Sequence, residues 1–179
     1  MKASPSTTWH QRLLAWASWP RIFALALIVV GFNRWMLPHI APLGLAYLPD
    51  THLYYTPETL WQWLAAYSPA ERARALWGHL TFDLAYPLLY GALLLLLLAK
   101  SWGPRFKPWL ARLPLAMILC DYGENFALAA LFTHWPGHNT SLAWLACGLT
   151  LAKWLLFGGI LTAIGIALFQ QYLSYKANL

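Results

Sequence analysis

The sequence predicts an all-α integral membrane protein, a polytopic bundle that crosses the bilayer four times. Of its 179 residues, 60% are hydrophobic and only 10% are charged, whereas a soluble domain carries about 25% charged residues. Predominantly apolar stretches recur four times, each with at least the roughly 20 residues that a helix needs to cross the hydrocarbon core. Because backbone polar groups must be satisfied inside the bilayer, each stretch is expected to be an α-helix. These spans cover residues 22–43, 76–99, 113–133 and 142–169.

A single transmembrane domain is expected over residues 22–173, since the four spans leave no room for a second domain. Residues 1–21 precede this domain as a cytoplasmic or interfacial segment. Within them, the Trp- and Leu-rich stretch 9–19 is typical of a short amphipathic helix lying at the membrane surface. Residues 174–179 follow the last span as a short tail.

The first outer loop contains two helix-start patterns. Thr56-Pro57-Glu58 combines a capping residue, a proline at the first helical position and an acid in the first turn,. Leu60, Trp61 and Leu64 follow at helical spacing, so a short extramembrane helix is expected over residues 57–67. Ser68-Pro69-Ala70-Glu71 has the spacing of a capping box, which indicates that the second long helix begins in water near Pro69.

Basic residues are distributed asymmetrically about the spans. Ten Lys and Arg flank the spans, and eight of these ten would face one side: Lys2, Arg12, Arg21, Lys100, Arg105, Lys107, Arg112 and Lys176. Only Arg72 and Arg74 would face the other side. The positive-inside rule then places both termini in the cytoplasm, and we expect a bacterial inner (plasma) membrane protein. The net charge of +6 fits contact with membrane lipids, and no nucleic-acid partner is expected.

Five ionisable residues lie inside the expected spans. A charge near the middle of the bilayer costs about 3 kcal/mol on insertion scales, so these side chains are expected to face one another, water or a ligand. An ionisable residue lies at a similar depth in every span, about 7–11 residues or roughly 10–17 Å from the outer end: Arg34, Asp83, Glu124 and Lys153. The fifth, Asp121, lies about one turn nearer the cytoplasm. The sequence therefore predicts a buried polar pocket in the outer half of the bilayer.

Helical spacing groups further polar residues with these charges. Asp121, Glu124 and Asn125 fall at positions i, i+3 and i+4, on one face of the third span,. His79 and Asp83 are four residues apart on the second span, and Tyr90 extends the same face.

A proline follows the second-span acid at the same spacing. Pro87 lacks the amide that would bond the Asp83 carbonyl. A kink and a free acceptor are therefore expected beside that acid.

The favoured function is that of a membrane-embedded enzyme or binding protein for a lipid or isoprenoid-like substrate. Buried carboxyl groups can act as general acid and base, and the expected catalytic residues are Asp83, Glu124 and Asp121. Substrate binding is assigned to Lys153, Arg34, Asn125, Tyr90 and His79, with the two cations holding an anionic head group.

Several alternatives stay open. The cluster could serve proton relay or small-molecule transport, or it could only fix the register of the helices in an accessory subunit or a homodimer. No cofactor is expected. The metal alternative is iron or manganese bound by His79, Asp83, Asp121 and Glu124.

The motifs YTPETLWQWL, FDLAYPLLYG, CDYGEN and TLAKW resemble those of an uncharacterised family of small bacterial four-helix integral membrane proteins. The resemblance covers Tyr55 to Trp154. It implies motif positions for Asp83, Tyr90, Asp121, Glu124, Asn125 and Lys153, and it implies no activity.

Overall fold

The computed structural model describes residues 8–178, which form seven α-helices and four short 3₁₀ turns, with no strand in that range. Four helical segments are long and apolar enough to cross a membrane, which confirms the predicted all-α polytopic bundle. They consist of α2 (Trp19–Ile40), the pair α4 (Pro69–Leu80) and α5 (Phe82–Trp102), α6 (Arg112–His134) and α7 (Thr140–Ala177).

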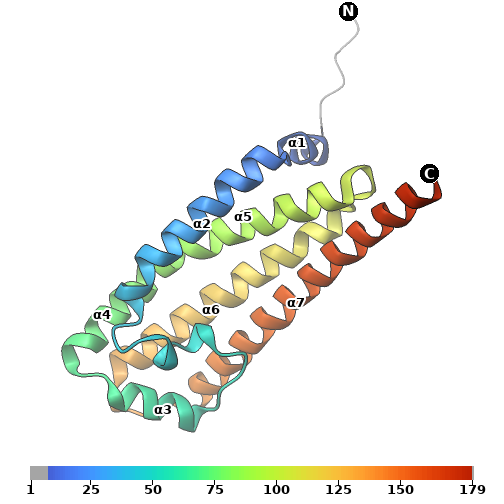
Figure 1. Ribbon diagram of the computed structural model, residues 1–179. Coiled ribbons are helices and arrows are strands. Elements are labelled where there is room, and N and C mark those ends of the chain that lie inside the picture. The colour runs from blue at the N-terminus through green and yellow to red at the C-terminus, as the bar shows by residue number, and fades with distance from the viewer. Residues whose placement is uncertain (1–7, 179) are drawn as a thin grey trace, which may run out of the picture.

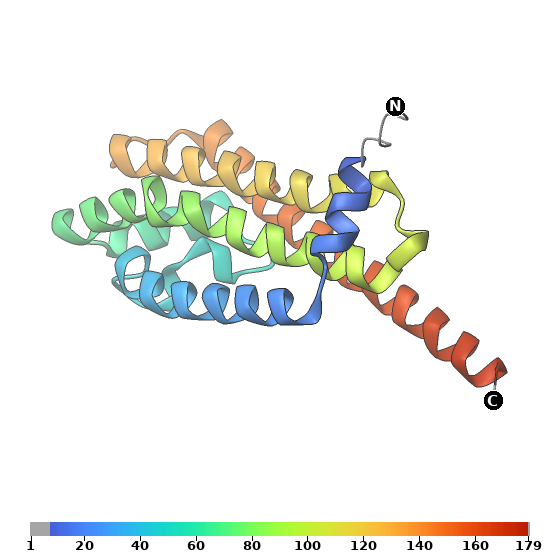
Figure 2. The ribbon, with the colours of Figure 1, turned by 90° about the horizontal axis from the view of Figure 1, so that it is seen from above.

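The long helices lie side by side along one direction (Figure 1). α5 lies between α2 and α6, and α6 packs along α7 over most of its length. The short helix α1 (Trp9–Trp16) lies near the end of α5, at the same end of the bundle as the last turns of α7. We call this the α1 end. Figure 2 shows the whole bundle from above, with α1 and the last turns of α7 at the same end. The opposite end, which we call the α3 end, carries α3 and the loop after α2.

Local capping explains where α3 and α4 begin. α3 (Pro57–Ala66) starts after Thr56, whose hydroxyl accepts a hydrogen bond from the Thr59 amide. This confirms the short helix expected in the first outer loop. At the start of α4, the Glu71 carboxylate accepts from the Ser68 amide at 2.9 Å, and the Ser68 hydroxyl accepts from the Glu71 amide. The predicted capping box is thus present.

The second membrane-spanning segment is interrupted, which the sequence analysis did not anticipate. α4 ends at Leu80 and α5 begins at Phe82, with Thr81 between them at φ −127° and ψ −80°. The Thr81 hydroxyl donates to the Trp77 carbonyl at 2.6 Å. The interruption lies two residues before Asp83 and six before Pro87, where a kink was expected; Pro87 itself lies within α5.

Two large apolar clusters fill most of the bundle, and a smaller one joins Met36 and Ile40 of α2 to Leu48. The cluster at the α3 end is formed by side chains of α3, α6 and α7, among them Leu60, Leu64, Leu128, Leu131 and Phe132. The cluster toward the α1 end includes Leu94, Leu98, Leu110, Met117 and Ile160. Large apolar side chains also face outward, including Phe23, Leu27, Val30, Leu155 and Phe169. Such an outward apolar surface suits contact with lipid.

The closest approach of α2 and α4 requires a glycine. A Cβ at Gly78 would lie 2.5 Å from Ile40 Cγ2 and 3.0 Å from Ile40 Cα. We expect Gly78→Ala to destabilise the protein by about 1–3 kcal/mol through overpacking, measured as a lowered melting temperature in detergent. The matched control is Gly148→Ala on α7, where a Cβ meets no atom within 4 Å. It should be neutral or stabilising, because alanine favours helix. Equal effects of the two variants would contradict the packing assignment.

Candidate functional site

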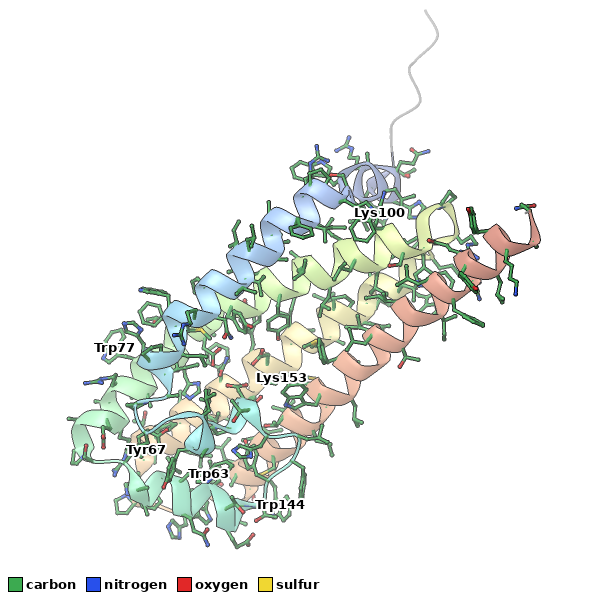
Figure 3. All side chains as sticks on the ribbon, viewed as in Figure 1. Trp63, Tyr67, Trp77, Lys100, Trp144 and Lys153 are labelled. Carbon is green, nitrogen blue, oxygen red and sulfur yellow. The ribbon has the colours of Figure 1, made fainter. Side chains whose placement is uncertain are left out.

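A single buried lysine is the centre of the polar cluster. Lys153 on α7 is 5% exposed. Its Nζ lies 3.2 Å from Asp121 Oδ1 and 2.7 Å from Glu124 Oε2, both on α6, and it also contacts Asp50 Oδ1. Figure 3 shows Lys153 part of the way along the bundle, beside the loop after α2. One ammonium group therefore serves three carboxylates from two different parts of the chain.

Asp50 reaches this lysine because the loop after α2 folds inward. Gly44 adopts φ 95°, a conformation that favours glycine,, and directs the chain into two 3₁₀ turns, Leu45–Tyr47 and Pro49–Thr51. Leu48 is buried between them, and the Thr51 hydroxyl donates to the Leu45 carbonyl at 2.7 Å. Burial acts to raise the pKa of Asp50, but the positive charges of Lys153 and His79 and the hydrogen bonds to this carboxyl group together outweigh burial and hold that pKa below its usual value.

A second group of contacts joins α4, α5 and α6. His79 Nδ1 lies 3.0 Å from Asp83 Oδ2 and 3.0 Å from Asn125 Oδ1. Because both partners are acceptors, Nδ1 carries the donated hydrogen. The Asn125 amide also donates to the Asp83 carbonyl at 3.1 Å. This is the carbonyl that Pro87 leaves without a helical partner. All three side chains are almost fully buried.

Hydroxyl groups satisfy one further oxygen on each of Asp121 and Glu124. Tyr90 donates to Asp121 Oδ2. The Thr150 hydroxyl lies 2.6 Å from Glu124 Oε1 and 3.1 Å from the Tyr55 hydroxyl. Burial and the nearby Glu124 raise the pKa of Tyr55, so this phenol stays protonated. Tyr55 precedes α3, so the segment before α3 contacts the same cluster as Asp50.

The structure brings seven of the eight predicted site residues together. They are Asp83, Asp121, Glu124, Lys153, Asn125, Tyr90 and His79. The charged residues predicted at a similar depth on α5, α6 and α7 thus lie in one connected cluster of side chains.

The expectation that Arg34 joins this layer is wrong. Arg34 is exposed, and it forms no ion pair within residues 8–178. Successive positions on a helix differ by about 100° around its axis. α2 turns the neighbouring Asn33 and Met36 toward the interior instead. The depth of Arg34 along its span did not specify which face of α2 carries the side chain.

Sequence reasoning missed Asp50, which takes the place expected for a residue of the first span. The available signal was the apolar character of residues 42–49, Pro-Leu-Gly-Leu-Ala-Tyr-Leu-Pro. A loop of this composition is expected to pack against the protein rather than extend into water. An acid directly after it is therefore a candidate for burial.

A cavity of about 600 Å³ adjoins the cluster. It lies between α2, α5, α6, α7 and the loop after α2. Its polar lining includes Asp50, Asp83, Asp121, Lys153 and Tyr90, and its apolar lining includes Val29, Met36, Leu93, Leu94, Met117 and Phe157. The volume falls within the range of about 300–1,000 Å³ of small-molecule sites. Glu124 and His79 are 0% exposed and lie behind this lining.

Acidic and histidine side chains lie close enough together to bind a metal ion. Potential ligand atoms of Asp50, His79 and Asp83 lie within 4.8 Å of one another, as do those of Asp50, Asp121 and Glu124. The second set already surrounds the Lys153 ammonium. The first set is therefore the one that a metal could use.

The fold and the cluster together define a polytopic α-helical membrane protein with a buried ionisable site. No protein-family model, curated protein or solved structure matches the chain.

Removing the ammonium group of Lys153 should destabilise the bundle. Lys153→Met leaves two buried carboxylates and the partly buried Asp50 without their shared partner, and losing one member of a buried ion pair costs about 3–5 kcal/mol. We expect a clearly lowered melting temperature in detergent, with partial recovery in Lys153→Met/Glu124→Gln. Lys176→Met on the exposed end of the same helix is the control and should melt like the wild type. A Lys153→Met protein as stable as this control would show that the cluster contributes nothing to stability.

The bond between Asn125 and the Asp83 carbonyl can be tested by a double-mutant cycle. Asn125→Ala should destabilise by about 1–3 kcal/mol, because buried polar partners lose their hydrogen bonds. Pro87→Ala supplies the missing amide to the same carbonyl, so the cost of Asn125→Ala should be smaller in that background. The measurement is chemical or thermal unfolding of all four proteins. Additive effects would mean that Asn125 does not compensate for Pro87.

Proposed function

We propose that the protein holds one lipid- or isoprenoid-like amphiphile inside the bilayer, with the polar end of that molecule at the Lys153 cluster. The observation that carries this proposal is the cavity of about 600 Å³. Its apolar walls end on buried ionisable side chains. A cluster that only fixed helix register would have no reason to leave such a space beside it.

The orientation of the ligand follows from the lining. Asp50, Asp83 and Tyr90 mark the polar end, whereas Leu94 and Met117 belong to the apolar cluster toward the α1 end. A hydrocarbon chain would therefore extend from the carboxylates toward the α1 end. Burial of its apolar surface would supply most of the binding free energy.

The chemistry that this site supports is proton transfer, and in that reading the protein is an acid–base enzyme acting on the bound amphiphile. Asp83 and Asp121 line the cavity, so they can meet a substrate. His79 orients Asp83, and Tyr90 donates to Asp121. Glu124 lies behind the lining and contacts Lys153, so its role would be to hold Lys153 and Asp121 in place. Asn125 would position Asp83.

An anionic head group does not fit this arrangement. Arg34 is turned away from the cavity, and the Lys153 ammonium is surrounded by three carboxylates. A phosphate or carboxylate ligand would meet acidic side chains with no cation left to neutralise it. The polar end of the ligand is therefore neutral or cationic.

Proton relay across the bilayer is less well supported. The ionisable cluster lies on one side of the apolar side chains Leu94, Leu98 and Ile160. A relay needs polar groups on both sides of such a barrier.

A metal ion is a second candidate occupant. His79 with Asp50 and Asp83 offers one nitrogen and carboxylate oxygens, a set that suits iron or manganese. Metal analysis of the purified protein and of His79→Gln addresses this candidate directly. A metal present in the wild type and absent from a folded His79→Gln protein would support it.

We further propose that the protein resides in a bacterial inner membrane with the α1 end in the cytoplasm. α1 and the last turns of α7 lie at the same end of the bundle. Arg12, Arg21, Lys100 and Lys176 are positioned along the elements that meet there. The positive-inside rule assigns such an end to the cytoplasm.

Filling the cavity should expel the amphiphile. Val29 is 9% exposed and lines the cavity, whereas the adjacent Val30 is 67% exposed on the outer face of α2. We expect Val29→Trp to lower the occupancy of a co-purifying lipid at least about tenfold. The indole ring would displace part of the hydrocarbon chain from the cavity, and each loss of about 1.4 kcal/mol of apolar burial weakens binding tenfold. Native mass spectrometry with lipid identification on protein extracted in nanodiscs is the measurement.

Val30→Trp is the matched control, and it should retain the bound lipid. If all three proteins carry lipids only in the proportions of the surrounding membrane, the cavity is not a ligand site and the proposed function is wrong.

A further inference from the structure

The buried cluster contains more acids than bases. Four carboxyl groups, those of Asp50, Asp83, Asp121 and Glu124, contact only two basic side chains, Lys153 and His79. With His79 protonated and every acid ionised, an excess of two negative charges remains. Uncompensated charge in a site of low dielectric is strongly unfavourable. The cluster therefore requires additional positive charge, supplied by protons or by a bound cation.

The excess acid faces the cavity. Asp50, Asp83 and Asp121 line it, whereas Glu124 and His79 lie behind the lining. Lys153 also reaches the cavity wall, but its ammonium is engaged by carboxylates from α6 and from the loop after α2. A ligand entering from the apolar end would thus meet carboxylate oxygens.

One carboxylate oxygen of the cluster lacks a partner. Asp50 Oδ1 contacts Lys153, but Asp50 Oδ2 is buried and accepts no hydrogen bond from any residue between 8 and 178. A carboxylate oxygen only accepts, so it requires a donor. Trp154 also lines the cavity, and its buried indole N–H is unpartnered in that part of the chain.

From these observations we propose that the polar end of the ligand is an ammonium group, so that the cavity binds a long-chain amine. This inference rests on the proposed amphiphile site. An ammonium donates to carboxylates and supplies positive charge, which compensates for the excess of acids that line the cavity. The apolar walls formed by Val29, Leu94 and Met117 accommodate its hydrocarbon chain.

The test compares three amphiphiles of equal chain length that differ only at the polar end. The full chain, in nanodiscs of phosphatidylcholine at pH 7, is titrated with tetradecylamine, tetradecanol and tetradecanoic acid, and one-to-one binding is measured by native mass spectrometry. We expect the amine to bind at least about tenfold more tightly than the alcohol, as charge-assisted hydrogen bonds imply. The acid should bind most weakly.

A variant that removes one negative charge tests whether the preference for the amine arises at the acidic cluster. Asp50→Asn should remove most of the preference for amine over alcohol, whereas Glu58→Gln, at an exposed acid on α3, should keep it. Asp83→Asn provides a second variant if Asp50→Asn does not fold, and the wild-type ranking stands without either.

The outcomes separate the two proposals. If the alcohol or the acid binds as tightly as the amine, the ammonium assignment is overturned while the amphiphile site stands. If none of the three binds one-to-one, the amphiphile site fails as well.

Discussion

The structure depends on one buried ammonium group. Lys153 lies about a third of the way along α7, the longest helix of the described chain, where an isolated charge would be costly,. It is tolerated because Asp121 and Glu124 on α6 and Asp50 on the loop after α2 all contact it. Each of these acids is in turn tolerated because of the lysine. The packing of α6 against α7 and the inward fold of the loop are therefore linked through the same few atoms.

This constraint also shapes the space beside it. The loop after α2 covers the α3 end of the cavity because Asp50 is held at Lys153 and Leu48 is buried. Tyr55, further along the same connection, meets the cluster through Thr150. Toward the α1 end the lining becomes apolar, so the cavity has one polar and one apolar end. An amphiphile is the kind of molecule whose two halves match these two ends.

The sequence predicted the membrane class, the capped extramembrane helix and most of the cluster, because these follow from hydropathy, capping residues and helical spacing. Asp121, Glu124 and Asn125 could be grouped since positions i, i+3 and i+4 share a face. Arg34 could not be assigned, because depth along a span does not reveal which way an isolated side chain points. Asp50 was missed because its contact with Lys153 joins residues 103 positions apart through an irregular loop. The interruption at Thr81 was missed because it carries no glycine or proline at the break itself.

The central claim is that an acid from an extramembrane loop meets a lysine inside the bilayer, and solid-state NMR of the protein in lipid bilayers tests it most directly. Nitrogen–carbon dipolar couplings report which carboxyl carbons lie next to the Lys153 ammonium. We predict couplings from this nitrogen to the carboxyl carbons of Asp121, Glu124 and Asp50. Couplings to Asp121 and Glu124 without one to Asp50 would place the loop outside the cluster, and would contradict both the cavity wall that the loop forms and the account of its polar end.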